Sequence, residues 1–198
     1  MGDKFAEIAF TDSVKSVQRA MGSRRSYARR EGGPDFDDRL GPDEAAFIAA
    51  RDSFYIASVS ETGWPYVQFR GGPPGFLRVL DDRTLGYADF RGNLQYITTG
   101  NVAVNDRVSL FLMDYPNRQR LKIFGRMRVV DIQEDSVLAA RLAVADYPAE
   151  VERAVRISVE AFNWNCPQHI TPRYTEAEWA TRGPARPPGG VAKSSAPA

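Results

Sequence analysis

The residues best suited to chemistry lie together near the C-terminus, in the segment Asn163-Trp164-Asn165-Cys166-Pro167-Gln168-His169-Ile170-Thr171-Pro172-Arg173-Tyr174. This segment holds the only cysteine and the only histidine of the chain, and one of its three tryptophans. A tryptophan ring can stack on a flat ligand, an imidazole can donate or accept a hydrogen bond, and a glutamine amide can pair with the edge of a heterocycle. The segment therefore predicts a binding loop for a flat ligand rich in heteroatoms, with Trp164, Gln168 and His169 as its contacts.

Metal binding and thiol chemistry explain this segment less well. One cysteine and one histidine make neither a Cys/His metal cluster nor an intrachain disulfide. A dyad of Cys166 and His169 is disfavoured, because the residue before a proline avoids the helical geometry that would bring the two side chains together. Two structural explanations stay open: His169 as an ordinary hydrogen-bonded loop residue, and Trp164 as core or interface packing. We predict no metal site.

A second candidate segment, Gln68-Phe69-Arg70-Gly71-Gly72-Pro73-Pro74-Gly75, lies between two predicted strands. Its glycines let backbone N–H groups approach a ligand closely, and Arg70 can supply positive charge beside it. The segment is neither a dinucleotide-binding GxGxxG motif nor a P-loop, since no Lys-Ser/Thr pair follows it. A bulged hairpin without a ligand is the alternative.

A third candidate segment runs from Asp89 to Asn101 and is rich in hydroxyl and amide side chains. Such groups, with backbone amides at a turn, can hold a phosphate without lysine. A capped helix with its connecting loop explains the same residues equally well. Further along, Arg118-Gln119-Arg120 enters a predicted strand and adds cations that face either the same ligand or water.

Length and composition indicate an ordinary globular protein. With 198 residues, 43% hydrophobic and 26% charged, the chain fits a single domain over residues 1–182. No apolar run approaches the roughly 18 residues of a membrane span, and the N-terminus does not resemble a secretory signal, so we expect a cytoplasmic protein that does not bind membranes. The net charge of +1 argues against nucleic-acid binding. The arginines between Arg24 and Arg30 are interpreted as a solvated or interface segment.

The hydrophobic pattern predicts a mainly β protein with flanking helices. Short runs of alternating polarity at close spacing favour an antiparallel barrel or sandwich over a parallel sheet. An N-terminal helical segment, 1–52, precedes this sheet, and residues 183–198, rich in Pro, Gly, Ala and Ser, are expected to be a disordered tail. Strands are predicted at 54–60, 66–70, 76–80, 84–88, 108–114, 120–130 and 155–161, and helices at 12–21, 42–51, 94–104, 135–146 and 175–180.

These elements in this order resemble the flavin-binding split-barrel superfamily, specifically proteins related to pyridoxamine 5'-phosphate oxidase. The resemblance covers about residues 42–174. It is anchored by the segment from Asn93-Leu94 to Asp106-Arg107-Val108-Ser109-Leu110, by the Gly125-Arg126 strand and by the motif at 163–170. It implies an antiparallel, Greek-key-like split β-barrel and a homodimer that binds FMN in clefts between its protomers.

The resemblance also implies which residues contact the flavin, and it shows one departure. Where the oxidase has Ser-Arg-Lys for the phosphate, this chain has Tyr96-Ile97-Thr98, so two cations are missing. Threonine and asparagine side chains can donate neutral hydrogen bonds in their place, and Arg70 or Arg120 can supply charge. Gln119 is an alternative to Arg120 at the strand start. The implied contacts are Gln68, Phe69, Arg70, Asn93, Tyr96, Thr98, Thr99, Asn101, Arg120, Trp164, Gln168 and His169.

The expected function is that of an FMN-dependent oxidoreductase acting on an unidentified small molecule. The oxidase's vitamin-phosphate reaction is not carried over, because its substrate residues have no clear equivalents here. Two alternatives stay open: a flavin-binding protein without turnover, serving storage or sensing, and a split barrel that binds haem, a deazaflavin or a tetrapyrrole instead of FMN.

Overall fold

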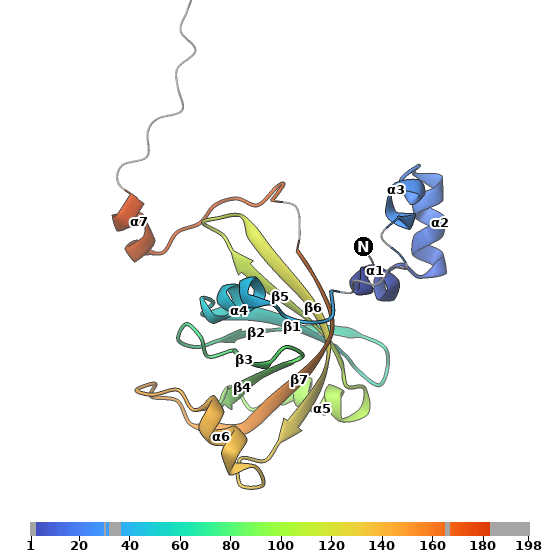
Figure 1. Ribbon diagram of the computed structural model, residues 1–198. Coiled ribbons are helices and arrows are strands. Elements are labelled where there is room, and N and C mark those ends of the chain that lie inside the picture. Colours follow the sequence, from blue (N-terminus) through green and yellow to red (C-terminus); the bar gives the residue numbers. More distant parts are fainter. Residues whose placement is uncertain (1–2, 30, 32–36, 165–166, 183–198) are drawn as a thin grey trace, which may run out of the picture.

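The computed structural model describes residues 3–29, 31, 37–164 and 167–182. Within these residues lies a seven-stranded sheet in the order β2-β1-β5-β6-β7-β4-β3, and all neighbouring strands are antiparallel (Figure 1). The strands are β1 (Ser53–Val59), β2 (Pro65–Gly71), β3 (Arg78–Asp81), β4 (Thr84–Phe90), β5 (Arg107–Asp114), β6 (Gln119–Val130) and β7 (Val151–Trp164).

The two long strands, β6 and β7, join the halves of the sheet. Leu121 of β6 is paired with Trp164 of β7, and Val130 with Ala154, so the two strands stay together over most of their length. The beginning of β7 also pairs with β4, which carries β3 at the edge of the sheet. The opposite edge is β2. A curved sheet whose edge strands do not pair with each other is the predicted split barrel, and the mainly β, antiparallel fold is confirmed.

The core explains why these segments form strands. In β5, buried residues at Val108, Leu110 and Leu112 alternate with half-buried ones, which is the period-2 pattern of a strand with one face in the core. In β6 the bulge after Phe124 brings Gly125 close to β7. A Cβ at Gly125 would lie 2.7 Å from Ile157 Cγ2, so only glycine allows this approach.

The described residues form seven helices in addition to the sheet. Figure 1 shows α2 and α3 standing away from the barrel, while α1 lies against it. Phe5 of α1 anchors this N-terminal group by stacking on Phe124 of β6, with ring centroids 4.3 Å apart. No described helix is long and apolar enough to cross a lipid bilayer. The helices are α1 (Lys4–Ala9), α2 (Asp12–Ala20), α3 (Arg24–Ala28), α4 (Pro42–Ala49), α5 (Ile97–Val104), α6 (Ser136–Leu142) and α7 (Glu176–Arg182).

Most predicted elements are present, and the differences have local causes. The helix predicted at 94–104 begins only at Ile97, because Leu94 and Tyr96 have left-handed backbone angles. The helix predicted at 135–146 ends at Leu142, and the strand predicted at 155–161 extends over Val151–Trp164. Helices α1 and α3 were not predicted by residue range, and α3 interrupts the expected loop at 23–41. The tail 183–198 lies outside the described residues.

Candidate functional site

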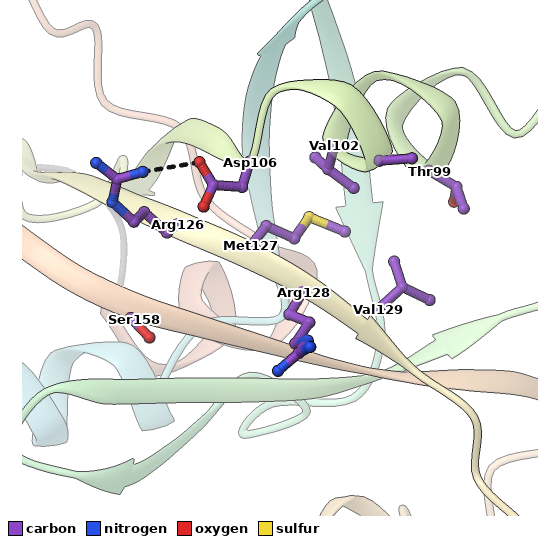
Figure 2. A pocket seen from close by; sticks show the side chains of 9 residues that line it. Thr99, Val102, Asp106, Arg126, Met127, Arg128, Val129 and Ser158 are labelled. Carbon is purple, nitrogen blue, oxygen red and sulfur yellow. Dashed lines mark hydrogen bonds and ion pairs between the residues drawn. The ribbon is translucent and has the colours of Figure 1, made fainter. Parts of the chain in front are cut away.

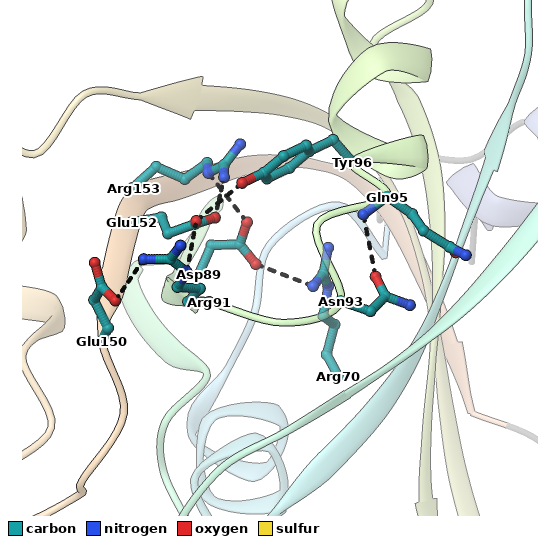
Figure 3. Close-up of polar contacts among 9 residues, drawn as sticks. All are labelled: Arg70, Asp89, Arg91, Asn93, Gln95, Tyr96, Glu150, Glu152 and Arg153. Carbon is teal, nitrogen blue, oxygen red and sulfur yellow. Dashed lines mark hydrogen bonds and ion pairs between the residues drawn. The ribbon is translucent and has the colours of Figure 1, made fainter.

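A cleft of about 200 Å³ opens where β2 and β4 end and α5 begins. Its walls come from four places in the sequence, which the sheet topology brings together: the end of β2, the end of β4, the loop into α5 with its first turn, and the start of β7 (Figure 3). The lining residues are Gln68, Arg70, Asp89, Phe90, Gly92, Asn93, Leu94, Tyr96, Ile97, Thr98, Thr99 and Glu152.

The first turn of α5 lines this cleft through Ile97, Thr98 and Thr99. The residue before the helix, Tyr96, has φ 51° and provides no side-chain cap, and its carbonyl accepts a hydrogen bond from Gly100 N at 2.8 Å. The first N–H groups of a helix have no partner within the helix, and they carry the positive end of its dipole. Left-handed angles at non-glycine residues cost about 1–2 kcal/mol each, so holding Leu94 and Tyr96 in this way indicates a constrained loop. The arrangement suits an anion.

Thr98 places a hydroxyl at the same point. The residue is 1% exposed, and its Oγ1 has no hydrogen-bond partner among the described residues. A buried hydroxyl without a partner costs about 1–3 kcal/mol. Since Thr98 lines the cleft, an incoming ligand oxygen would satisfy this group.

A buried charge network forms the other wall of the cleft (Figure 3). Asp89 is 5% exposed and lies between two arginines, with 3.1 Å from its Oδ1 to Arg70 Nη1 and 3.4 Å from its Oδ2 to Arg153 Nε. Burial raises the pKa of the Asp89 carboxyl, and the two guanidinium groups oppose that shift. Arg70 Nε is also buried without a hydrogen-bond partner in the part of the chain that the structure describes.

Tyr96 contacts the network through its ring and through its hydroxyl. The Arg153 guanidinium lies 4.7 Å from the ring centroid, and the Tyr96 hydroxyl donates to Glu152 Oε1 at 3.0 Å. Burial raises the pKa of the Glu152 carboxyl, but hydrogen bonds from Tyr96 and Arg153 outweigh this effect, and the pKa of Glu152 is lowered. The arginines at this wall are therefore balanced by carboxylates and do not act as free cations.

The structure brings six of the predicted site residues into this cleft: Gln68, Arg70, Asn93, Tyr96, Thr98 and Thr99. Two neighbours of these residues point elsewhere. Phe69 is 56% exposed on the other face of β2, because successive strand residues face opposite sides. Asn101 is buried in α5 and donates to Ser58 Oγ at 2.9 Å, which is a structural contact.

The remaining predicted residues lie away from the cleft. Trp164 packs edge-on against Phe47 and donates its Nε1–H to Glu44 Oε1 at 2.7 Å, so it is attached to α4. With Arg120, it lines a separate cavity of about 510 Å³ under the N-terminal helices. Gln168 and His169 are exposed in a turn after β7. Asn165 and Cys166 lie outside the described residues.

Sequence reasoning missed the charged wall. Asp89 and Arg153 are directly opposite each other in the β4–β7 register. Asp89 opened the third candidate segment but was not predicted as a contact, and Arg153 was missed because the predicted strand at 155–161 did not include residue 153. The signal available in the sequence was an aspartate at the end of a buried strand, because a buried carboxylate is almost always paired with a cation.

A larger cavity, of about 620 Å³, lies between α5 and β6, and Thr99 lines both it and the cleft (Figure 2). The polar groups drawn there include Arg126 and Asp106, which form an ion pair at 2.9 Å. No group of three or more His, Cys, Asp or Glu side chains that could hold a metal ion occurs within the described ranges.

Several solved structures have a similar fold. Among solved structures, the fold is similar to that of a candidate pyridoxamine 5'-phosphate oxidase from Lactobacillus delbrueckii, with a TM-score of 0.50 and 20% identity over 64% of this chain and 94% of that one. It is also similar to an FMN-binding protein from Syntrophomonas wolfei (TM-score 0.48, 10% identity, 78% and 96% of the chains) and to HupZ from Group A Streptococcus (0.48, 15%, 68% and 99%).

The comparison with curated proteins gives no match. The family model for pyridoxamine 5'-phosphate oxidase matches residues 40–165, which include all seven strands of the sheet and every residue that lines the cleft. This match covers more than half of the chain, and the chain therefore belongs to the pyridoxamine 5'-phosphate oxidase family.

Proposed function

We propose that this protein is an FMN-binding flavoprotein whose cleft at the start of α5 holds the FMN phosphate. The observation that carries the proposal is the buried Thr98 hydroxyl, which has no hydrogen-bond partner within the described part of the chain and lies in the first turn of a helix without a side-chain cap. A phosphate oxygen would accept from this hydroxyl and from the backbone N–H groups of the first turn, which together form an anion site. The residues present fit the group.

This arrangement also accounts for the missing Arg-Lys pair. The helix dipole and neutral donors from Thr98 and Thr99 offset the phosphate charge, and Arg70, although its charge is balanced by Asp89, adds an N–H donor, because its Nε has no hydrogen-bond partner among the described residues. Asp89 holds the Arg70 guanidinium at the cleft wall. The phosphate would thus be bound with less added positive charge than an Arg-Lys pair supplies.

The flavin ring would need a second wall, which supports a homodimer. A cleft of about 200 Å³ is smaller than the roughly 300–1,000 Å³ of sites that enclose a ligand of this size. On the outer face of β1 and β2, three apolar side chains are exposed: Tyr55 (40%), Val67 (60%) and Phe69 (56%). Such a patch is typical of an interface. In the dimer, the partner's Trp164 would supply a stacking surface for the ring.

Bound FMN supplies hydride or electron transfer, and we propose an oxidoreductase acting on a small molecule. The chain's own residues would bind and orient the cofactor. Purified protein should be yellow and should release a flavin with the mass of FMN on denaturation. A colourless protein that does not bind added FMN would overturn the proposal, and a released cofactor of different mass would overturn the choice of FMN.

The dimer has its own test. Phe69→Glu should convert the protein to a monomer in analytical ultracentrifugation, because it buries a charge in an apolar interface. Val137→Glu is the matched control, since Val137 is equally apolar and 72% exposed on α6, away from the patch. A wild-type protein that is monomeric with full flavin occupancy would contradict the shared site.

A second candidate function is flavin binding without turnover. Each charged side chain that lines the cleft is already engaged in an ion pair, which leaves no free acid or base there. Bleaching of the flavin absorbance by a donor, followed by catalytic reoxidation in air, supports the enzyme. Stable colour with a broad panel of donors supports the binding protein.

A further inference from the structure

Exposed arginines from several strands share one outer face of the sheet. Residues directly opposite each other on neighbouring strands point to the same face. Arg128 of β6 is opposite Arg156 of β7, and Arg126, two residues before Arg128, is opposite Arg107 of β5. The row continues across β4 to β3, where it ends at an exposed arginine. We call this set the arginine face: Arg78, Arg107, Arg126, Arg128 and Arg156.

Most of the charge on this face is not neutralised. Within the described residues, Arg126 is the one member that forms ion pairs, with Asp106 at 2.9 Å and with Glu160 at 2.8 Å. Arg128 and Arg156 form none, although they are directly opposite each other. Like charges in that position repel each other and destabilise the pair of strands. An anionic partner would relieve this repulsion.

The carboxylate of Asp81 near this face is already engaged. Its Oδ1 accepts from Arg83 N at 2.9 Å, and this hydrogen bond is the main cause that lowers the pKa of Asp81, to which the charge of Arg156 adds. Arg78 Nη2 donates to the carbonyl of Ala143 at 2.8 Å, which orients the guanidinium but leaves its charge in place. The arginine face therefore presents an excess of positive charge to solvent.

The side chains of this face suit the carboxylates of another protein. Beside the arginines, none of the described residues 126–130 and 155–158 is an exposed aromatic or large apolar side chain. Such side chains would be needed to stack on nucleic-acid bases or to insert into a lipid surface. The net charge of +1 gives no long-range attraction to an extended polyanion. A compact partner with a local acidic patch fits this distribution of charge.

The arginine face also adjoins the proposed flavin cleft. Arg126, Arg128 and Ser158 line the cavity of about 620 Å³ together with Thr99, and Thr99 lines the cleft as well (Figure 2). A protein bound across β6 and β7 would therefore lie beside the cofactor. Contacts between electron-transfer proteins are small, and complementary charge gives them speed and specificity.

We propose that the arginine face is the docking surface for an acidic electron-transfer protein that supplies electrons to the flavin. The redox step rests on the proposed function, whereas the docking depends only on the arginines. Two molecules of a one-electron carrier would each be oxidised by one electron, and the bound FMN would take up both electrons with two protons from water.

The probe is a plant-type 2Fe–2S ferredoxin, which is acidic, and the control is cytochrome c, which is basic. Calorimetric titration of oxidised ferredoxin into the flavin-free protein should show saturable binding. The affinity should fall about tenfold or more between about 0.05 and 0.5 M NaCl, because salt screens exposed charges. Cytochrome c should not bind. In stopped-flow absorbance, reduced ferredoxin should reduce the FMN of the loaded protein with the same dependence on salt.

Charge-reversal variants locate the surface. Arg128→Glu and Arg156→Glu should each weaken ferredoxin binding about tenfold or more, and should slow reduction of FMN by ferredoxin but not by dithionite. Each variant places a carboxylate opposite the remaining arginine, so neither should lower the Tm. The matched control is Arg19→Glu on α2, which stands away from the sheet and should bind ferredoxin as the parent does (Figure 1).

Three results would overturn the proposal: no saturable binding of ferredoxin, unchanged affinity in both variants, or equally tight binding of a DNA duplex or of phosphatidylglycerol vesicles. The two proposals can fail separately, because docking is measured on the flavin-free protein. A protein that binds ferredoxin but no FMN would contradict the FMN proposal and leave the docking surface in place. A yellow protein that does not bind ferredoxin would contradict the docking surface alone.

Discussion

Replacing Thr98 with valine should stabilise the flavin-free protein and at the same time weaken its binding of FMN. The two side chains have nearly the same shape, so the change removes the hydroxyl and leaves the packing of α5 almost intact. In the free protein Thr98 Oγ1 is buried and unpartnered among the described residues. Removing a buried hydroxyl of this kind gains about 1 kcal/mol of unfolding free energy, which corresponds to a rise of about 2–4 °C in Tm for a protein of this size.

The effect on FMN has the opposite sign. If the hydroxyl donates to the phosphate, its loss removes a hydrogen bond to a charged group, which is worth about 1.5–3 kcal/mol. The Kd for FMN should therefore rise roughly 10-fold to 150-fold. Thermal unfolding of the flavin-free protein measures the first quantity, and quenching of FMN fluorescence on titration measures the second.

Thr84→Val provides the control for this experiment. Thr84 is also buried, but it lies at the start of β4, at the end of that strand away from the cleft, and its hydroxyl interacts with Asp81. This variant should lose stability and keep its FMN affinity. If Thr98→Val destabilises the flavin-free protein and leaves the Kd for FMN unchanged, the hydroxyl has a structural partner and does not bind the phosphate.

Three further outcomes are expected. Asp89→Asn should lower the unfolding free energy by about 3 kcal/mol in urea denaturation, since it leaves two largely buried arginines without their shared carboxylate; a loss below about 1 kcal/mol would contradict a buried ion network. Arg24 lowers the pKa of Glu31 from its usual 4.5 to about 2, so their contact stabilises the α2–α3 region above pH 4.5 and is lost as the pH falls toward 2. Amide signals of α2 and α3 should move in that pH range, and Glu31→Gln should abolish the transition. Gly125→Ala should cost about 1–3 kcal/mol, measured by thermal unfolding, because its methyl group would lie 2.7 Å from Ile157 Cγ2; unchanged stability would mean that the bulge can adapt.

The sequence by itself determined the strands and several of the groups in the cleft. Alternation of buried and half-buried residues, as in Val108, Leu110 and Leu112, is a local pattern with a period of two, and it can be recognised before the chain is folded. The hydroxyls at Thr98 and Thr99 and the charge at Arg70 were likewise recognisable as residue types that bind phosphate. The role of these residues toward FMN stays a prediction.

Only the tertiary structure decided how these groups are arranged. Strand register places Asp89 opposite Arg153, and alternation within each strand does not specify which residues of two strands will pair. The same limit applies to Trp164: its residue type suggested a ligand contact, but the direction of β7 attaches it to Glu44 of α4, away from the cleft. Pairing between distant segments depends on the whole sheet, so the charge of the cleft and the separation of its predicted contacts could be known only from the folded chain.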